Sequence, residues 1–179
     1  MAEETPEHSP DQAECLAFID GFRAVVLATV DESGEPDASQ APFVRDRRGR
    51  IYLYLSELAK HTPNLRTSGR ASLLWLADEA VTQNPFARQR LTLQCAASVV
   101  ARGSAEWERV ITLFTERFGP TIGVLRQLAD FHLFRMRARS GSYVKGFAQA
   151  FELHGEALHV GPRIQGPSQS TGTGFRREE

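Results

Sequence analysis

Hydrophobic and polar residues follow one another in short blocks along the chain, and turn-forming residues separate the blocks. AVVLATV (24–30) is dense in β-branched residues, DESGEP (31–36) predicts a turn, and DASQAPFV (37–44) predicts the returning strand. After a second predicted turn, RDRRG (45–49), the segment IYLYL (51–55) predicts a third strand. The first part of the chain therefore predicts a meander of antiparallel strands and not a series of βαβ units.

Further strand-like segments follow in the second half. ASLLWLA (71–77) is apolar throughout, so we expect a fourth strand that is covered on both faces. RLTLQCAASVVA (90–101) predicts a long fifth strand, and FHLFRMRA (131–138) with GSYVKGFAQAFEL (141–153) predicts a final hairpin. A sheet of this many strands favours a closed barrel, because closure removes the exposed edges of the sheet.

Three segments carry helix signals. Pro10 and Asp11 open a helix that Gly21 ends. In TPNLRTS (62–68) Thr62 is expected to cap a short helix with Pro63 at its first position. SAEWERVITLFTERF (104–118) has a serine cap and an apolar stripe at helical spacing, which indicates a core-facing helix rather than a cofactor site. The stripe consists of Trp107, Val110, Ile111, Phe114 and Phe118.

These elements predict a mainly β protein with flanking helices. We expect one domain over residues 11–160, a disordered N-terminus over 1–10, and a flexible tail over 161–179, where Gly, Pro, Ser, Thr and Gln dominate.

The composition argues against nucleic-acid binding and against a membrane-spanning protein. Hydrophobic residues make up 41% of the 179 residues, and the formal net charge of -1 gives no basic excess for nucleic acid. The chain has no apolar stretch of the roughly 18 residues that a membrane span needs, and its first residues lack a signal-peptide pattern. We therefore expect a cytoplasmic protein. Cys15 and Cys95 show no metal-ligand spacing and are expected to be buried free thiols.

The segment YLSELAKHTPNL (54–65) concentrates polar side chains where an apolar strand ends and a helix begins. A helix N-terminus presents unpaired N–H groups and a positive partial charge, which suit a phosphate or carboxylate. Side-chain donors nearby would add to such an anion site. The competing interpretation is an ordinary helix cap with solvated charges. The candidate donors are Ser56, Lys60, His61 and Thr62.

Several segments in order resemble the pyridoxamine 5′-phosphate oxidase-like split-barrel superfamily, and within it the haem-utilisation (HugZ/HutZ-type) branch. The resemblance covers about residues 11–160 and implies a six-stranded antiparallel Greek-key split barrel. It also implies a homodimer with its ligand in the cleft between subunits. The matching segments are ATVDESGEPDASQAPFV, YLYLSELAKHTPNL, ASLLWL, NPFARQRLTLQ, FHLFRM and YVKGFAQAFEL.

In the flavin-binding relatives, the resemblance implies that the strand–turn–helix segment grips the phosphate of FMN. Lys60-His61 matches the family's serine and paired basic residues only in part. The substrate-binding arginine and histidine motif of the vitamin-making oxidases is not recognisable, so a true pyridoxamine phosphate oxidase is not expected. The residues carried over to an FMN site are Ser56, Lys60, His61, Thr62, Arg90 and Gln94.

In the haem branch, the resemblance implies that a C-terminal histidine is the axial ligand of haem iron and that arginines meet the propionates. His159 is the first choice because its neighbours are apolar, and His154 is the second. An acid before the late strand, here Asp130, is implied to orient that histidine across the dimer. The implied reaction is oxidative opening of the haem ring with O₂ and an external reductant.

Three functions therefore stay open from the sequence. The first is a haem-binding and haem-degrading dimer, the second an FMN-dependent oxidase or reductase on the same barrel, and the third a module that stores or delivers a ligand without turnover. Hydrolytic functions have little support, since the chain has no nucleophile elbow, no HExxH and no glycine-rich phosphate loop.

Overall fold

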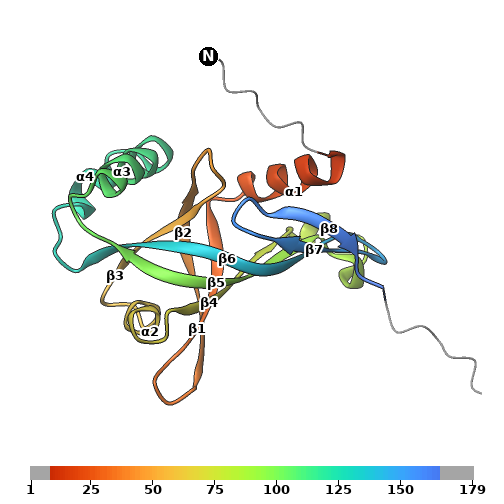
Figure 1. Cartoon of the computed structure of the whole chain (residues 1–179), viewed down its shortest axis with the longest axis horizontal. Coiled ribbons are helices and arrows are strands. Elements are labelled where there is room, and N and C mark those ends of the chain that lie inside the picture. Colours follow the sequence, from red (N-terminus) through yellow and green to blue (C-terminus); the bar gives the residue numbers. More distant parts are fainter. Residues whose placement is uncertain (1–8, 166–179) are drawn as a thin grey trace, which may run out of the picture.

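The computed structural model describes residues 9–165 and contains a closed, six-stranded antiparallel barrel (Figure 1). The neighbour order is β3-β2-β1-β4-β5-β6, and pairing between β3 and β6 closes the ring. The expected fold class is confirmed, because the meander of β1, β2 and β3 supplies one part of the wall and β4 to β6 the other. The barrel strands are β1 (Ala24–Val30), β2 (Pro36–Arg45), β3 (Ile51–Ser56), β4 (Arg70–Leu76), β5 (Arg90–Val100) and β6 (Phe131–Gly146).

Two further strands and several helices surround the barrel. The strands continue the sheet beyond β6, and α1 lies beside them in Figure 1, far from α3 and α4. These elements are β7 (Gln149–His154), β8 (His159–Arg163), α1 (Pro10–Asp20), α2 (His61–Ser68), α3 (Ala105–Phe118), α4 (Thr121–Leu125) and the short 3₁₀ turns η1 (Glu79–Val81) and η2 (Pro85–Ala87).

Two apolar clusters hold the fold together. The larger fills the barrel and the contact with α1, and it includes Phe43, Trp75 and Cys95. The smaller lies between the outer barrel wall and α3, as the helical stripe predicted, with Trp107 and Phe114 buried against strand residues. Side chains of the two clusters pack against the barrel strands and so support any site on the sheet surface.

Both cysteines are buried free thiols, as expected. Burial raises the pKa of Cys15 and of Cys95 to about 12, so both thiols stay protonated at neutral pH.

The predicted final hairpin is wrong in its boundaries. Residues 131–146 form one continuous strand, and the turn comes at Phe147 and Ala148, before β7. The prediction placed the turn at residues 139–140 and began the second strand at Gly141, but Gly141 lies inside β6 at a place of close backbone approach. A Cβ there would lie 2.5 Å from the carbonyl oxygen of Thr92 on β5. The glycine is thus required by packing between strands and not by a turn.

Three smaller expectations also need correction. β4 alternates buried and half-exposed residues in this chain, so it is not covered on both faces. Thr62 does not cap α2: Lys60 is the N-cap residue and makes no side-chain capping bond, and Pro63 is the third helical residue rather than the first. β8 continues to Arg163, beyond the predicted domain end at 160. The remaining predicted termini, 1–8 and 166–179, lie outside the described residues.

Candidate functional site

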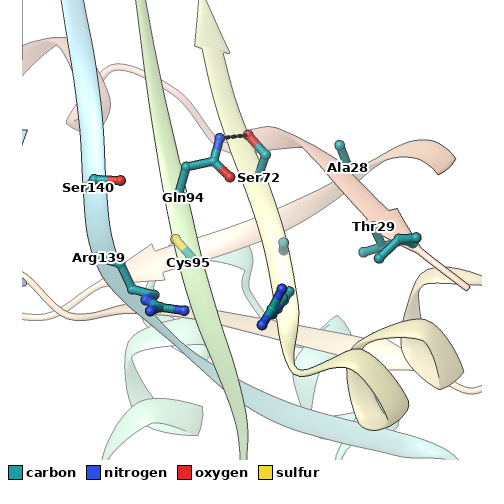
Figure 2. A pocket seen from close by; sticks show the side chains of 10 residues that line it. Ala28, Thr29, Ser72, Gln94, Cys95, Arg139 and Ser140 are labelled. Carbon is teal, nitrogen blue, oxygen red and sulfur yellow. Dashed lines mark hydrogen bonds between the residues drawn. The ribbon is translucent and has the colours of Figure 1, made fainter. Parts of the chain in front are cut away.

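A cavity of 610 Å³ opens on the sheet surface between β1, β4, β5 and β6 (Figure 2). Its volume lies within the roughly 300–1,000 Å³ that ligand sites occupy in proteins. Only four strands contribute to it, so its shape depends on strand register rather than on loops. The lining residues are Ala28, Thr29, Val30, Arg70, Ala71, Ser72, Gln94, Cys95, Arg139 and Ser140.

The hollow follows from a row of small side chains that crosses the sheet. Ala28 pairs with Ser72, Ser72 with Gln94, and Gln94 with Ser140, so these four residues stand side by side on four strands. Three of them are small, which leaves space above the sheet. The amide nitrogen Nε2 of Gln94 donates a 3.2 Å hydrogen bond to the Ser72 hydroxyl (Figure 2). Gln94 therefore lies in the cavity wall with its orientation set by a neighbour.

A β-bulge places an arginine at this row. The register between β5 and β6 shifts after Gln94, because Ser140 pairs with Gln94 and Ala138 pairs with Cys95. Arg139 is the extra residue of the bulge, and its side chain lies beside Cys95 in the cavity (Figure 2). Bulges commonly redirect a side chain next to a functional site.

The cavity is positively charged. Arg70 and Arg139 line it, no acidic residue does, and neither arginine forms an ion pair with any residue in the described range 9–165. Two unpaired guanidinium groups beside an open hollow favour carboxylate or phosphate groups of a ligand, which they can bind with two parallel hydrogen bonds.

In the polar junction 54–65, two of the candidate donors hydrogen-bond to other groups of the same chain. The Ser56 hydroxyl donates a 2.7 Å hydrogen bond to Oδ2 of Asp130, and the Thr62 hydroxyl donates a 2.6 Å bond to the Ser56 carbonyl oxygen. Thr62 is fully buried. Both hydroxyl protons are therefore used inside the protein. The structure does bring Ser56 and Asp130 together, although they are 74 positions apart in the sequence.

The two basic residues of the junction are also poorly placed for a phosphate. His61 is buried, its Nδ1 lies 2.9 Å from the Ser39 hydroxyl, and burial lowers its pKa against the opposing effect of Asp37. The imidazole is thus neutral at pH 7. Lys60 lines a separate depression that it shares with the carboxylates of Asp31, Glu35 and Asp37. Such acidic surroundings oppose an anion.

The helix start itself offers few free N–H groups. The backbone N–H groups of Ala59, Thr62 and Asn64 donate to carbonyl oxygens of Ser56, Ala59 and Lys60. Pro63 has no N–H to donate. Several donors of the junction are therefore engaged by protein acceptors within this chain, and the anion site at 54–65 stays a prediction. α2 also supports the cavity wall, because Nδ2 of Asn64 donates a 3.0 Å buried hydrogen bond to Thr29 of β1.

The remaining predicted residues are spread over the sheet. Arg90 begins β5, and its guanidinium donates to the Arg88 carbonyl oxygen, whereas Gln94 lines the cavity. His154 ends β7 and His159 begins β8, where the two residues pair in register and both are exposed. No histidine among residues 9–165 lines the cavity.

Sequence reasoning missed the two cavity arginines and Asn64. Arg70 and Arg139 belong to a set of basic residues that is almost all arginine, which hides any single one. The small residues around Arg139, in ARSGS (138–142), are unusual in a buried strand. They could have indicated a hollow or a bulge at this position.

Comparison with known proteins agrees with this architecture. Residues 12–145 match the family model described as pyridoxamine 5′-phosphate oxidase. The chain is also 42% identical over 147 residues to a protein named heme oxygenase HutZ from Vibrio cholerae, covering 82% of this chain and 83% of that protein. The chain belongs to the haem-utilisation branch of the pyridoxamine 5′-phosphate oxidase-like superfamily.

Solved members of the superfamily share the fold. A crystal structure of HutZ from Vibrio cholerae, described as a heme storage protein, superposes with a TM-score of 0.67 at 39% identity, over 71% of this chain and 89% of that chain. ChuZ from Campylobacter jejuni gives a TM-score of 0.75 at 31% identity, over 89% of this chain and 66% of that chain. The split-barrel architecture of the branch is thus the architecture of this chain.

No helix within residues 9–165 is long and apolar enough to cross a membrane. The same residues contain no group of three or more His, Cys, Asp or Glu side chains that could together hold a metal ion. A haem iron has a different requirement, since the porphyrin supplies four nitrogens and the protein adds one or two axial ligands.

Proposed function

We propose that this chain binds haem in the cavity between β1, β4, β5 and β6, in a homodimer whose partner subunit completes the site. The observation that carries the proposal is the pair Arg70 and Arg139, which are unpaired in the described part of the chain and line a cavity without acids. Haem has two propionates, so two arginines match its charge. The small side chains of the row through Ser72 leave room for a flat ring.

The proposed axial ligand is a histidine, and it comes from outside the cavity, because no described residue lining the cavity is a histidine. We assign this role to His159, with His154 as the second choice. Both side chains are exposed, as expected for residues that reach a second copy of the chain. Asp130 is assigned to orient the histidine, and its Oδ2 already accepts a 2.7 Å hydrogen bond from Ser56, which holds the carboxylate in one direction.

When bound, haem would supply the iron at which O₂ and electrons from an external reductant open the porphyrin ring. The residues of this chain would hold the propionates, ligate the iron and keep water from the ring. The names given to the similar Vibrio cholerae protein differ on whether haem is degraded. The protein is named a heme oxygenase, and its crystal structure is described as that of a heme storage protein. Oxidative degradation is the first proposal, and storage without turnover is the second. A cytoplasmic location also stays a prediction.

The FMN alternative has less support in this chain. The predicted phosphate donors turn inward: Ser56 and Thr62 donate to protein groups, and His61 is buried and neutral. Lys60 lines a depression together with three acids, Asp31, Glu35 and Asp37, which oppose a phosphate there.

A hemin titration tests the proposal. The Soret band of the wild-type complex is expected to shift on binding, and His159→Ala is expected to change its position, with His154→Ala as the comparison. Arg139→Gln should weaken hemin binding at least tenfold. Arg137→Gln, an exposed arginine two positions away on the same strand, is the matched control and should change it less than twofold.

Three outcomes contradict parts of the proposal. Unchanged spectra in both histidine variants exclude the axial assignment, and equal binding by Arg139→Gln and Arg137→Gln excludes the propionate assignment. A sedimentation run that shows only monomer removes the dimer cleft. FMN that copurifies with the protein, or binds it at micromolar concentration while hemin does not, favours the flavin alternative. Addition of ascorbate to the hemin complex separates degradation from storage.

A further inference from the structure

A second hollow, remote in sequence from the proposed haem cavity, lies where the turn between β2 and β3 meets α3. It has a volume of 470 Å³ and shares no lining residue with the first cavity. Four of its residues are arginines, and the other members are two acids and one leucine. The lining residues are Asp46, Arg47, Arg48, Arg50, Arg109, Leu113 and Glu116.

Asp46 is the centre of the turn. Its side chain is 4% exposed, and Oδ1 accepts hydrogen bonds of 3.0 Å from the backbone N–H groups of both Arg48 and Arg50. Oδ2 accepts a 2.8 Å bond from Nε of Arg50 and lies 3.2 Å from a guanidinium nitrogen of Arg109 on α3. The Asp46 carboxylate is therefore saturated, and it fixes the turn to the helix.

The charge of Asp46 is neutralised within the protein. Burial by itself would raise the pKa of this carboxyl, but the hydrogen bonds from the side chain and backbone of Arg50 outweigh burial and lower the pKa. The carboxylate is thus ionised at neutral pH, and the two arginines beside it hold it in place. It does not compete for the other two arginines of the hollow.

Arg47 and Arg48 carry the excess charge. Both are exposed at the tip of the turn, and neither forms an ion pair with another residue of the described segment 9–165. Gly49 follows them in the left-handed region, with φ of 82°, and a Cβ added there would lie 3.1 Å from the Glu156 carbonyl oxygen. The hydrogen bonds to Asp46 fix the backbone of the tip, so little backbone entropy would be lost when a ligand binds.

The chemistry of the hollow selects a compact anion with several oxygens. Its charged lining residues are four arginines and two acids, a net charge of +2. Arginine binds phosphate with two parallel hydrogen bonds, and a concave site favours a small ligand over a flat protein surface. Leu113 adds an apolar contact for the carbon part of such a ligand.

We propose that the hollow between the β2–β3 turn and α3 binds a phosphorylated small molecule through its phosphoryl groups. Arg47 and Arg48 make the main contacts. Arg50 and Arg109, which also contact Asp46, Glu106 and Tyr52, add positive charge to the hollow. The proposal is independent of haem binding, since it involves none of the residues assigned to that function.

Isothermal titration with inorganic pyrophosphate, at constant ionic strength set with sodium chloride, tests this site in the full-length protein. Saturable binding is expected for the wild type, and the double variant Arg47→Gln/Arg48→Gln should bind at least tenfold more weakly. The control Arg137→Gln/Arg163→Gln removes the same charge from exposed positions on β6 and β8 and should bind within twofold of the wild type.

Two results overturn the proposal. Absence of saturable pyrophosphate binding is one, including the case in which the protein instead cosediments with phosphatidylglycerol vesicles. Equal weakening in the two double variants is the other, because it would show a general response to net charge rather than a site. Circular dichroism spectra and melting temperatures of both variants establish that each is folded when binding is measured.

Discussion

The side chain of Gln12 and the backbone of Leu158 tie the two ends of the described chain together. Nε2 of Gln12 donates a 2.9 Å hydrogen bond to the Leu158 carbonyl oxygen, and its Oε1 accepts a 2.7 Å bond from the N–H of Val160. The amide thus binds the backbone on both sides of His159. Leu158 has a positive φ of 56° and is buried, so Gln12 holds a turn that costs roughly 1–3 kcal/mol to form.

Replacing Gln12 with leucine should loosen this turn. Gln12→Leu keeps the side-chain size but removes all three amide hydrogen bonds, including a 3.4 Å bond to the Ala157 carbonyl oxygen. It leaves backbone groups of Leu158 and Val160 without this partner, so the free energy of unfolding should fall by about 1–3 kcal/mol. Urea unfolding measures this loss, and hydrogen exchange should show a faster rate at the Val160 amide. Gln127→Leu, at an exposed position, is the control. Equal stability of the two variants would show that the Gln12 bonds contribute nothing.

Stability should depend on pH through His61. Its pKa is lowered in the folded protein, chiefly by burial, so below the ordinary value of 6.5 the unfolded chain binds a proton that the folded chain does not. The free energy of unfolding should therefore be highest above pH 6.5 and fall as the pH drops from there toward the folded-state pKa. His61→Gln keeps a polar partner for Ser39 and should lose less stability between pH 7.5 and 5.5 than the wild type. Parallel pH profiles of the two proteins would contradict this linkage.

Asp46 should stabilise the fold far more than an exposed acid does. Asp46→Asn leaves Arg50 and Arg109 without their buried counter-ion, so a loss of about 3 kcal/mol is expected. Asp20→Asn removes the acid of an ion pair with Arg45 in which the acid side chain is 48% exposed, and it should cost less than about 1 kcal/mol. Denaturant midpoints of the two variants compare the sites directly, and similar losses would refute the role of Asp46.

Gly141→Ala tests the close approach of β5 and β6. The added Cβ would lie 2.5 Å from the Thr92 carbonyl oxygen and 2.6 Å from Cδ2 of Leu93, and a backbone oxygen moves aside less easily than the end of a flexible side chain. A loss of about 2 kcal/mol or more is expected in thermal unfolding. Gly123→Ala is the matched control, because a Cβ added there would have no atom within 4 Å. A neutral Gly141→Ala would mean that the strands can separate at little cost.

Much of the fold followed from local pattern. The period of apolar residues predicted β1 to β5 and α3, and Ser104 caps α3 by accepting a bond from the Trp107 N–H as its position suggested. The boundaries of the late hairpin could not be predicted from local sequence, because a glycine is found both in turns and in strands that approach a neighbouring backbone closely. Only the positions of Thr92 and Leu93 distinguish the two cases.

The sequence indicated the fold more directly than it indicated the cavity. The donors of the junction 54–65 were correctly recognised as a polar cluster, but hydrogen-bond direction decides whether such a cluster faces a ligand or the protein. Ser56 and Thr62 donate inward to groups that no local rule connects with them. The cavity instead formed where a row of small residues from four strands coincided with a bulge at Arg139, and strand register is a long-range property.

The sequence by itself determined the class of the fold and its family, because periodicity, turn residues and ordered motifs are formed by residues that are close together in the sequence. The tertiary structure alone decided which polar groups are free. Burial keeps His61 neutral, the Asp130 carboxylate accepts a hydrogen bond from the Ser56 hydroxyl, and no acid of the described chain lines the cavity beside Arg70 and Arg139. Charge and hydrogen-bonding capacity depend on partners that are distant in sequence, and folding alone brings them within reach.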